Sequence, residues 1–457
     1  MNLLILGVDR FHWAYAEPLG NRWIQTPTLN RLAADGVVFG QCYATSPDPV
    51  VQWRSLLTGF HPLVMTAEAA ESTTALEKRM EPKSLVTALR QRGWRTQFLT
   101  ESNNFYAMPE TAWFEDAGRI GDDGRSGDHG CDCGTCAESM DETELFATMA
   151  ALHAAIDECA DREQPFMIAM HIGSLGWRWD APLEYRMRYV EGSDPDPGDS
   201  ARVPSIRFGA NGPPDGCRSP DPDALLQVRQ AYAGQISLLD ELLEPLADWL
   251  DDDPVGRQTA LLLVGLRGFP LAEHGAIGAA GDLTSDGVTD PSGGIYAETT
   301  HVPAILRMPT ESMMLDAAVA VRSASLVELS DLAAVLWRVT CGEVPEPVRR
   351  TARLPDEPFG GECGEGENGE RDRILLVGVN GERGLVTPIW YLRIPRADDD
   401  TPAELYLRRD DPFQVNGVAN RCHEIVESLT TTLHETESAL RTATPSPPLP
   451  EIATIEP

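Results

Sequence analysis

The residues best suited to bind a metal ion lie in one short segment of the sequence. Residues 128–136 read DHGCDCGTC and contain His129, Cys131, Cys133 and Cys136. Thiolate and imidazole groups at short spacing are typical ligands of Zn²⁺. Four ligands in a single knuckle would nevertheless form a strained cage. The sequence therefore leaves two interpretations open, a zinc site or a loop with reduced or oxidised thiols.

His171 is a second candidate ligand-binding residue, because it ends an apolar run that is typical of a buried strand. A histidine at the end of a strand can contact a ligand, and it can equally be a hydrogen-bonded residue of the core. Which of these roles it takes depends on the elements that position it.

Apolar, strand-like runs alternate with helical patterns through the first three quarters of the chain. This alternation predicts an α/β fold, in which a mostly parallel central sheet has helices on both faces. The expected strands are residues 2–8, 96–100, 166–171, 260–265 and 302–307. The expected helices are residues 28–35, 84–92, 142–159, 223–250 and 325–339.

The C-terminal quarter has a different pattern, which predicts a small α+β subdomain. The runs RILLVGV and IWYLRI indicate a short antiparallel sheet, and residues 418–440 indicate a helix. We therefore expect an α/β domain at residues 1–345, a C-terminal subdomain at 346–442 and a disordered Pro-rich tail at 443–457.

Several segments of the chain together carry a family resemblance. They read NLLILGVD, TPTLNRLAADGVVFGQCYATSP, SLVTALRQRGWRTQFLT, HVPAILRMP and ELYLRRDDPFQVNGVA. In this order they resemble the sulfatase family of the alkaline-phosphatase superfamily, over about residues 2–442. The resemblance implies the alkaline-phosphatase type of α/β fold. It also implies hydrolysis of sulfuric esters with the help of bound Ca²⁺ or Mg²⁺.

The segment that corresponds to the sulfatase nucleophile has lost its reactive residue. Residues 46–59 read SPDPVVQWRSLLTG, and the resemblance places Pro49 where the family has its Cys or Ser. A shift by one residue places Val50 there instead, and neither side chain has a heteroatom that can attack an ester. We therefore interpret the segment as a structural turn. Cys42 and Ser46 lie upstream, and using either one would require a different loop.

Other positions that the resemblance assigns to the active site also depart from the family pattern. Arg10 stands where the family has the second residue of an acidic pair, and Glu101 stands at a lysine position. Gly176 replaces a histidine that faces the substrate. Arg267 stands at one of two lost positions for metal ligands, so Asp9 is at most a vestigial ligand.

Asp9, Arg10 and Arg267 are expected together at adjacent strand ends. Two guanidiniums in place of two carboxylates oppose the binding of a divalent cation. Three interpretations remain, which are an internal ion pair of Asp9, an anion pocket built from arginine, and residual metal binding. Arg54 and His274 are further candidates for binding an anion or ligand, and His274 lies in LAEHG, a segment that resembles a sulfatase motif.

The charge balance of the chain excludes several classes of partner. Acidic residues outnumber basic ones by 71 to 37, which gives a net charge of −34. Such a chain is repelled by nucleic acid and by anionic membrane surfaces. The N-terminal MNLLILGVDR lacks the basic start and cleavage site of a signal peptide, and 9 cysteines in 457 residues favour reduced thiols. We therefore expect a cytoplasmic location.

The loss of the reactive groups favours a catalytically inactive, sulfatase-like protein that acts as a binding, scaffolding or regulatory module. A first alternative is a hydrolase of sulfuric or phosphoric esters with a non-standard active site. That enzyme would use Cys42 or Ser46 together with His171 or His274.

A second alternative is an anion sensor that uses Arg10, Arg54 and Arg267. We expect no cofactor, apart from zinc if the cysteine segment binds it. The partner would be a protein or a small anionic ligand, and the sequence leaves the oligomeric state open.

Overall fold

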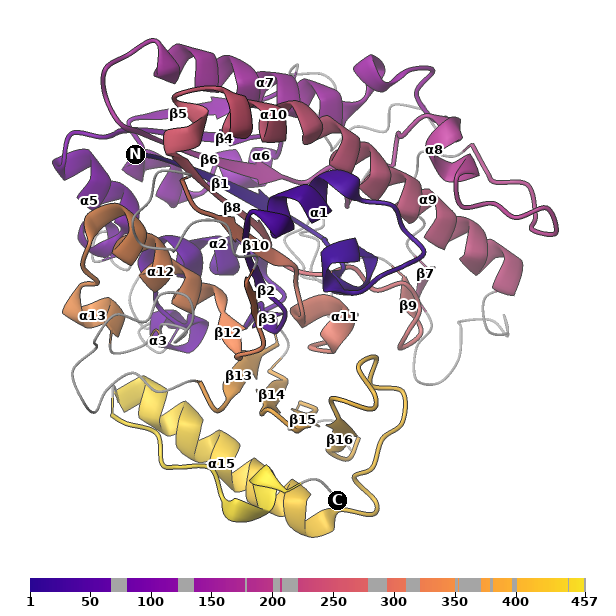
Figure 1. Cartoon of the computed structure of the whole chain (residues 1–457). Helices are drawn as coiled ribbons and strands as arrows, with labels where there is room; N and C mark the ends of the chain where they lie inside the picture. Colours follow the sequence, from indigo (N-terminus) through magenta and orange to yellow (C-terminus); the bar gives the residue numbers. More distant parts are fainter. Residues whose placement is uncertain are drawn as a thin grey trace. The chain divides into compact units, whose positions relative to one another are not determined.

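The computed structural model of the protein describes most of the chain (Figure 1). The described residues are 1–66, 80–121, 135–176, 179–199, 206–207, 221–277, 294–309, 321–349, 352, 371–378, 381–396, 401–442 and 444–455. The packing of the backbone divides the chain into two compact units. Unit 1 comprises Met1–Val38, Leu89–Ala279 and Pro303–Arg322, and unit 2 comprises Phe39–Ala88, Ala280–Val302 and Ser323–Pro457.

Unit 2 joins parts of the sequence that lie far apart, so one boundary near residue 345 does not describe the packing. The backbone N–H of Val377 donates to the carbonyl of Thr45 at 2.8 Å. The rings of Tyr43 and His301 are stacked with their centroids 4.8 Å apart. An N-terminal segment and a central segment therefore pack with the C-terminal part of the chain.

The large sheet, which lies almost wholly in unit 1, has eight strands in the order β11-β2-β10-β8-β1-β6-β4-β5 among the described residues. The neighbouring strands β8, β1, β6, β4 and β5 are parallel, whereas β10 runs antiparallel to both β8 and β2. The expected mostly parallel α/β sheet is confirmed. The bounds are β1 Asn2–Val8, β2 Gly36–Phe39, β4 Arg95–Thr100, β5 Asp116–Arg119, β6 Phe166–Ile172, β8 Thr259–Gly265, β10 Ala304–Arg307 and β11 Val321–Ser323.

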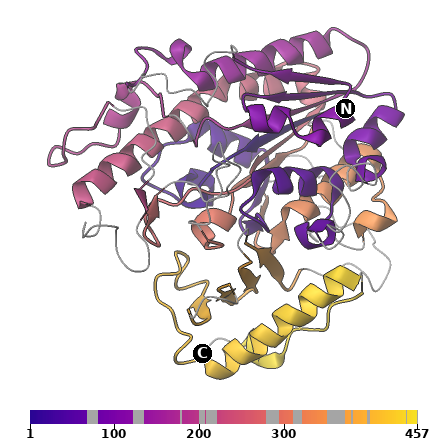
Figure 2. The same cartoon turned by 180° about the vertical axis from the view of Figure 1, so that it is seen from behind.

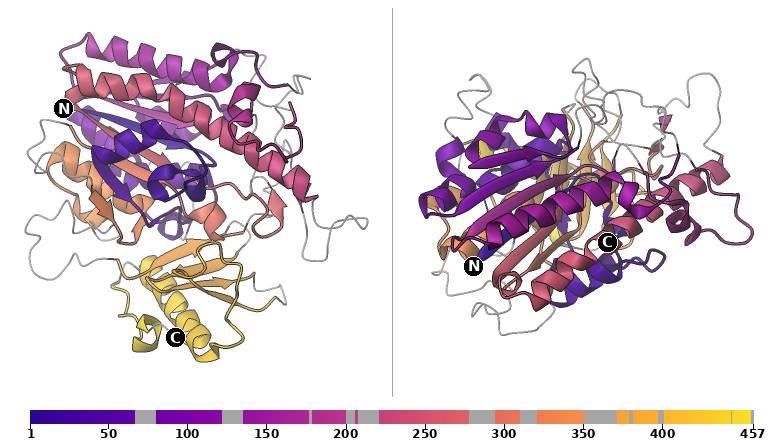
Figure 3. Two further views of the ribbon diagram at one scale, coloured as in Figure 1. Left: turned by 45° about the vertical axis from the view of Figure 1, so that its right-hand side comes forward. Right: turned by 90° about the horizontal axis from the view of Figure 1, so that it is seen from above.

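The central strands β1, β6 and β8 are buried on both faces, as strands covered on both sides must be. All seven residues of β1 are buried. Leu4, Leu6 and Val8 alternate along β1 and pack in one cluster with residues of α7 and α9, such as Leu152 and Leu239. Figure 3 shows α7 and α9 running alongside the strands. Period-two alternation thus fixes which side chains of β1 meet these helices.

The helices of unit 1 follow the sequence pattern except at one break. The expected helix at 223–250 is wrong as a single element, because the chain forms two helices separated at Leu243. Pro245 lies at the start of the second helix, where it has no N–H to continue the hydrogen-bond ladder. No described helix is long and apolar enough to cross a membrane. The bounds are α1 Pro27–Ala34, α6 Asn103–Tyr106, α7 Glu144–Ala160, α8 Leu183–Met187, α9 Pro222–Leu242 and α10 Glu244–Asp252. The helix α5 Leu85–Gln91 is assigned to unit 2 up to Ala88 and to unit 1 from Leu89.

A four-stranded antiparallel sheet forms the C-terminal part of unit 2, in the order β13-β14-β15-β16. This confirms the sheet expected from RILLVGV and IWYLRI, and β14 and β16 extend it. Leu375, Leu385 and Leu392 pack against Leu429 and Leu433 of the helix α15, which lies along the sheet in Figure 2. The bounds are β13 Ile374–Val377, β14 Arg383–Val386, β15 Trp390–Ile394, β16 Glu404–Leu407 and α15 His423–Thr442.

The remaining helices of unit 2 belong to its N-terminal and central segments. The helix expected at 325–339 begins later, because β12 precedes it and Glu328 and Asp331 form a capping box at its start. The bounds are α2 Pro49–Thr58, α3 Pro62–Thr66, α11 Ala297–Thr300, α12 Leu329–Cys341 and α13 Glu346–Arg349. Short strands complete the described elements, namely β3 Cys42–Tyr43, β7 Ile206–Arg207, β9 Ala276–Ile277 and β12 Val327–Glu328.

The Pro-rich tail is a correction to the sequence interpretation. Residues 444–455 are described and packed, not disordered. Nη2 of Arg373 donates to the carbonyl of Pro447 at 2.7 Å. Ala453 is buried in the same apolar cluster as α15. The composition of the tail predicted disorder because it does not reveal these two contacts, which are made by the side chain of Ala453 and the backbone carbonyl of Pro447.

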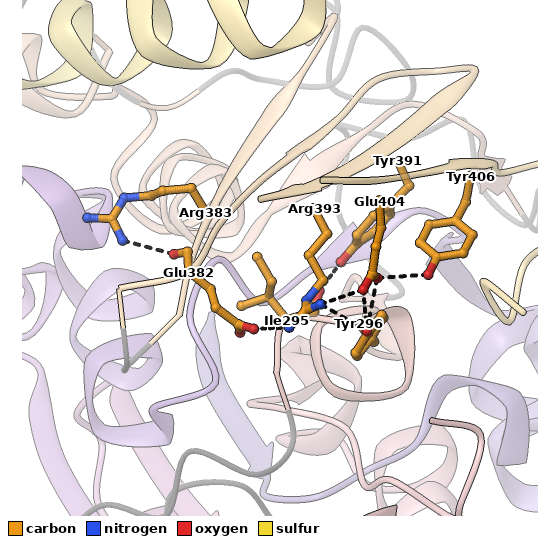
Figure 4. A network of polar contacts seen from close by, with 8 residues as sticks. All are labelled: Ile295, Tyr296, Glu382, Arg383, Tyr391, Arg393, Glu404 and Tyr406. Atoms are coloured by element: carbon orange, nitrogen blue, oxygen red, sulfur yellow. Dashed lines mark hydrogen bonds and ion pairs between the residues drawn. The ribbon is translucent and has the colours of Figure 1, made fainter. Parts of the chain in front are cut away.

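A polar network ties the segment before α11 to the C-terminal sheet (Figure 4). Arg393 on β15 forms ion pairs with Glu382 and, at 2.8 Å, with Glu404. The Tyr296 hydroxyl donates to Glu404 at 2.9 Å, and the Arg393 guanidinium lies 4.5 Å from the centre of the Tyr296 ring. The Tyr391 hydroxyl donates to the carbonyl of Ile295. These contacts explain why residues far apart in sequence belong to one unit.

Candidate functional site

The carboxyl ends of β1 and β8 bring an aspartate and an arginine side by side. The two strands are parallel neighbours, and Val8 pairs with Gly265. Asp9 follows β1 directly, and Arg267 follows β8 after one intervening residue. The two oxygens of the Asp9 carboxylate accept from one edge of the Arg267 guanidinium, at 2.7 Å from Nε and 3.1 Å from Nη2. Bidentate geometry of this kind gives the strong form of the interaction.

Arg10 adds a second guanidinium to the same carboxylate. Its Nη1 lies 3.5 Å from Oδ2 of Asp9, and both side chains are buried. Arg10 has a φ of 61°, a left-handed conformation that costs a non-glycine residue roughly 1–2 kcal/mol. The Tyr232 hydroxyl holds it there, because it donates to the carbonyl of Arg10 at 2.6 Å and accepts from the N–H of His12 at 3.0 Å.

Gly176 leaves the space that the Arg10 side chain fills. A Cβ atom at position 176 would lie 1.8 Å from Nη1 and 2.3 Å from Cδ of Arg10. Non-bonded heavy atoms have their optimal separation at about 3.5–4.0 Å, so the two groups cannot coexist without movement. Arg10 and Gly176, which the sequence interpretation treated as separate positions, are therefore one structural feature.

The pKa of Asp9 shows which effect dominates in the cluster. Burial raises the pKa of the carboxyl, but the guanidiniums of Arg267 and Arg10 outweigh burial and lower the pKa to about 2. Asp9 is therefore ionised at neutral pH and its charge is satisfied inside the protein. The internal ion pair, one of the three interpretations left open by the sequence, is present. We name Asp9, Arg10 and Arg267 the Asp9 cluster.

Glu101, at the carboxyl end of β4, is a buried carboxyl with a different set of partners. It accepts hydrogen bonds from the N–H of Gly173, from the hydroxyl of Ser174 and, at 2.9 Å, from the hydroxyl of Thr148. Burial is the largest effect on Glu101 and raises its pKa to about 7. The sequence identified Glu101 but not its two hydroxyl partners, because residues from α7 and from the segment after β6 meet it only in the folded chain.

His171 lies near the carboxyl end of β6 and is fully enclosed. Its Nδ1 lies 3.0 Å from the hydroxyl oxygen of Thr100, and the ring stacks on Phe105 with centroids 3.5 Å apart. Burial lowers the pKa of His171 to about 3, so the ring is neutral at physiological pH. Its Nε2 has no hydrogen-bond partner among the described residues. These contacts are those of a core histidine, which was one of the two interpretations left open.

The segment at 46–59 is a helix rather than the structural turn that the sequence suggested. The helix α2 begins at Pro49, and Asp48 is its N-cap. Oδ1 of Asp48 accepts from the N–H groups of Val50 at 2.9 Å and Val51 at 3.2 Å. An Asp at the N-cap followed by a Pro at the first helical position is a recognisable helix start, and this signal could have corrected the interpretation.

The two upstream candidates for a nucleophile are poorly suited to attack. Cys42 lies in β3 and is fully buried, and burial raises the pKa of its thiol far above its usual range. The Ser46 hydroxyl oxygen accepts from the N–H of Asp48 at 3.3 Å, so it helps to form the turn before α2. Both residues belong to unit 2, whereas His171 and His274 belong to unit 1.

The remaining candidates for anion binding are divided between the two units. Arg10 and Arg267 meet at Asp9, and Arg54 lies on α2 in unit 2. His274 is half-buried in the turn before β9. Oε1 of the neighbouring Glu273 lies 3.5 Å from Nε2 of the buried His12.

The cysteine segment lies mostly outside the described residues, and this applies to His129, Cys131 and Cys133. Cys136 is described and half-buried, and its N–H donates to the carbonyl of Asp199 at 2.7 Å. Burial raises the pKa of the Cys136 thiol. Within the described part of the chain, no three or more His, Cys, Asp or Glu side chains are grouped as a metal site would require.

The described strand ends of unit 1 therefore hold an ionised carboxylate paired with two cations, a neutral imidazole, and a carboxyl whose pKa is about 7. Hydroxyls contact the last two groups, because Thr100 lies 3.0 Å from His171 and Ser174 donates to Glu101. All four of these side chains are buried, which opposes access by a substrate.

Comparisons with known proteins identify a family from the sequence and a shared fold from solved structures. The family model described as Sulfatase matches residues 1–339. A structure solved with its substrate D-glucosamine-2-N,6-O-disulfate has a TM-score of 0.70 and 16% identity, covering 96% of this chain and 98% of that one. The phosphonate monoester hydrolase of Agrobacterium radiobacter has a TM-score of 0.67 and 16% identity, covering 96% and 95%. That of Silicibacter pomeroyi has a TM-score of 0.68 and 15% identity, with the same coverage. The search of curated protein sequences found no match.

Proposed function

The chain belongs to the sulfatase family, and we propose that it is a member without hydrolytic activity that acts as a binding, scaffolding or regulatory module. The observation that carries this proposal is the Asp9 cluster. The single carboxylate at the end of β1 already binds the Arg267 guanidinium through both oxygens and lies 3.5 Å from Nη1 of Arg10. A carboxylate that is neutralised in this way has little to offer a substrate or a metal ion.

The divalent cation that the family implies does not fit the residues of the Asp9 cluster. Calcium needs about 6–8 oxygen ligands, several of them anionic, and magnesium needs a near-octahedral set. The cluster supplies one carboxylate and two guanidiniums, and a guanidinium has five donors and no acceptor. Both cations would be repelled by the two arginines. The Asp9 cluster is therefore unsuited to hold a catalytic divalent cation.

The helix α2 gives independent support in unit 2. The first backbone N–H groups of a helix bind anions well, because they are unpaired and the helix dipole adds a positive charge. In α2 the N–H groups of Val50 and Val51 are occupied by the carboxylate of Asp48. Pro49 has no group that could act as a nucleophile. An internal carboxylate thus takes the place that an anionic substrate would need at this helix.

The two alternatives have weaker support. The structural relatives named as phosphonate monoester hydrolases share 15–16% identity with the chain, which supports a common fold and no common activity. A nucleophilic Cys42 would need a thiolate, and its buried environment opposes that charge. An anion sensor would need free guanidiniums, and those of Arg10 and Arg267 are directed at Asp9.

A combined measurement of metal content and turnover tests the proposal. The purified chain is analysed for bound Ca²⁺, Mg²⁺ and Zn²⁺, and is assayed with aryl sulfate, aryl phosphate and aryl phosphonate esters. We expect no stoichiometric Ca²⁺ or Mg²⁺ and no turnover above that of the Asp9→Ala variant. Stoichiometric Ca²⁺ or Mg²⁺ together with turnover that is lost in Asp9→Ala would overturn the proposal. Bound Zn²⁺ without Ca²⁺ or Mg²⁺ would indicate a zinc site in the cysteine segment at residues 128–136, and would not bear on the Asp9 cluster.

A further inference from the structure

We propose that Asn416 is a site of spontaneous deamidation, through which the chain acquires an isoaspartyl linkage in the loop between β16 and α15 (Figure 1). Asn416 is followed directly by Gly417, within the segment DDPFQVNGVAN at residues 410–420. The inference concerns a covalent change in unit 2 and is independent of whether the chain hydrolyses esters.

The reaction consumes only water and needs no enzyme. The backbone nitrogen of Gly417 loses its proton to solvent hydroxide and attacks Cγ of the Asn416 side chain, so that a new N–C bond forms. The C–N bond of the side-chain amide breaks and ammonia leaves, which closes a five-membered succinimide ring. Water then opens the ring at either carbonyl. One opening gives an aspartyl residue, and the other gives an isoaspartyl residue whose backbone passes through Cβ.

The attacking nitrogen of Gly417 is accessible to solvent. Gly417 is exposed, and its N–H donates to no acceptor among the described residues, so no hydrogen bond has to break before the proton leaves. A glycine also has no Cβ that would obstruct the approach of its nitrogen to the preceding side chain. The sequence and the structure thus favour attack at the same position.

The Asn416 side chain is equally free to react. It is exposed, and its amide forms no hydrogen bond with another described residue. Only the backbone N–H of Asn416 is held, because it donates to Oδ2 of Asp411 at 2.7 Å. The side chain can therefore turn its Cγ toward the nitrogen of Gly417 without losing a contact to the described part of the chain.

Asn420 provides a comparison within the same loop. It is also exposed, but it is followed by Arg421, whose N–H donates to the carbonyl of Val418 at 2.9 Å. Attack by that nitrogen requires this hydrogen bond to break, and the Arg421 side chain adds the bulk that a glycine lacks. We therefore expect the reaction at Asn416 and not at Asn420.

The isoaspartyl product alters the hydrogen bonds that fix this loop. The N–H of residue 416 is held by Asp411, and the N–H of Val418 donates to the carbonyl of Leu405 in β16 at 2.8 Å. An isoaspartyl residue lengthens the backbone between these two N–H groups by one atom, so the loop must shift for both bonds to be kept. The new carboxylate also lies close to that of Asp411, and like charges repel. We therefore expect the isoaspartyl form to be less stable than the original chain.

Peptide mapping of the folded, full-length chain tests the proposal. The chain and a synthetic peptide of residues 410–421 are kept at mildly alkaline pH, and the tryptic peptide 410–421 is sequenced by mass spectrometry at intervals. The other Asn–Gly pairs, at residues 211–212, 368–369 and 380–381, fall in other tryptic peptides. We expect conversion at Asn416 to aspartate and isoaspartate, at a rate that rises with the hydroxide concentration and lies within tenfold of the rate in the free peptide. Asn420 should stay unchanged.

Conversion of the free peptide without conversion of the folded chain would overturn the proposal, because the fold would then protect Asn416. Equal conversion at Asn416 and Asn420 in the folded chain would also overturn it, since the hydrogen bond at Arg421 would then have no influence.

Gly417→Ala provides the sharper arm of the experiment. A Cβ at position 417 would meet only Cε1 of Tyr406, at the ordinary contact distance of 3.8 Å, and the φ of Gly417 is not positive. The variant should therefore fold as the unmodified chain does, and it should slow conversion at Asn416 at least tenfold. The matched control is Val415→Ala, because Val415 is 65% exposed in the same loop and leaves the Asn–Gly pair intact. A rate that Gly417→Ala does not change overturns the proposal.

The effect on stability is tested with Asn416→Asp, which adds the charge without lengthening the backbone. The isolated isoaspartyl form should have a lower midpoint of thermal unfolding than this variant. Equal midpoints would show that the longer backbone does not disturb the loop, and would overturn the expected loss of stability.

Discussion

Asp9 and Glu101 are both buried carboxyl groups at the carboxyl edge of the large sheet, yet their pKa values move in opposite directions. Burial raises both, and only Asp9 has guanidiniums close enough to reverse the effect. Its pKa falls to about 2, whereas the pKa of Glu101 rises to about 7. Hydrogen bonds from Ser174 and Thr148 lower the pKa of Glu101 but do not offset burial.

The comparison shows that hydrogen-bond donors and cations are not equivalent partners for a buried carboxyl. Neutral donors satisfy the lone pairs of Glu101, but burying its ionised form still costs free energy because no cation compensates the charge. The two guanidiniums at Asp9 satisfy both the lone pairs and the charge. The carboxyl edge of the large sheet therefore holds two different carboxyl groups. Asp9 is ionised at neutral pH, whereas Glu101 gains and loses its proton near neutral pH.

The largest expected effect comes from removing the anion of the Asp9 cluster. Asp9→Ala leaves two buried guanidiniums without their counter-ion, and breaking a buried ion pair in this way costs about 3–5 kcal/mol. We expect a loss of this size in the free energy of unfolding, measured by urea denaturation at neutral pH. The matched control is Asp141→Ala, an exposed carboxylate for which we expect a change within about 0.5 kcal/mol.

The variant Asp9→Leu/Arg267→Met sharpens the same test, because it removes both charges of the bidentate pair. Its loss of stability should be smaller than that of Asp9→Ala. If Asp9→Ala lowers the free energy of unfolding no more than Asp141→Ala does, the Asp9 cluster does not stabilise the folded chain. The contrast drawn between Asp9 and Glu101 would then be wrong.

The next effect concerns the dependence of stability on pH through Glu101. The pKa of Glu101 is about 7 in the folded chain and 4.5 ordinarily, so the folded state retains a proton that the unfolded state releases between these values. The stability that this proton provides is complete below pH 4.5 and is lost as the pH rises through 7. Glu101→Gln has no proton to lose. Its stability relative to the unmodified chain should therefore increase from pH 4.5 to 8, by at most about 3 kcal/mol.

Urea denaturation of both proteins across this pH range measures the difference. A matched control is Glu142→Gln, because Glu142 is an exposed carboxylate for which we expect no comparable trend. A difference between Glu101→Gln and the unmodified chain that stays constant with pH would contradict the assigned direction of the shift.

The smallest of the three effects tests how Arg10 and Gly176 depend on each other. Gly176→Ala forces the Arg10 side chain to move, and overpacking of this kind costs about 1–3 kcal/mol. In the background Arg10→Gly the obstruction is gone, so Gly176→Ala should cost much less. A double-mutant cycle of unfolding free energies gives the coupling directly. Equal costs of Gly176→Ala in both backgrounds would refute the contact.

The sequence predicts the central strands and the Asp9 cluster well, for a physical reason. Long apolar runs define β1 and β8, and the carboxyl ends of adjacent parallel strands necessarily meet. Residues within two positions of the end of each strand are therefore placed within reach of one another. Arg267 and Asp9 could be paired from the sequence without knowing the path of any loop.

The features that the sequence did not predict depend on tertiary contacts or on a competing interpretation. The close approach of Arg10 to Gly176 depends on the path of the chain after β6, which periodicity does not specify. The helix α2 was missed because Pro49 was considered as a lost nucleophile and not as the first residue of a helix. The Asp48–Pro49 pair is typical of a helix N-terminus and would have predicted α2.

The contact between Arg10 and Gly176 also constrains the order in which this chain could change over evolutionary time. A histidine at position 176, where the sulfatase resemblance places one, requires that Arg10 be replaced first. Replacing Arg10 removes one of the two cations that neutralise Asp9. Introducing a histidine at position 176 therefore passes through at least one less stable intermediate. Arg10 and Gly176 thus preserve each other, because a change at either position alone lowers the stability of the folded chain.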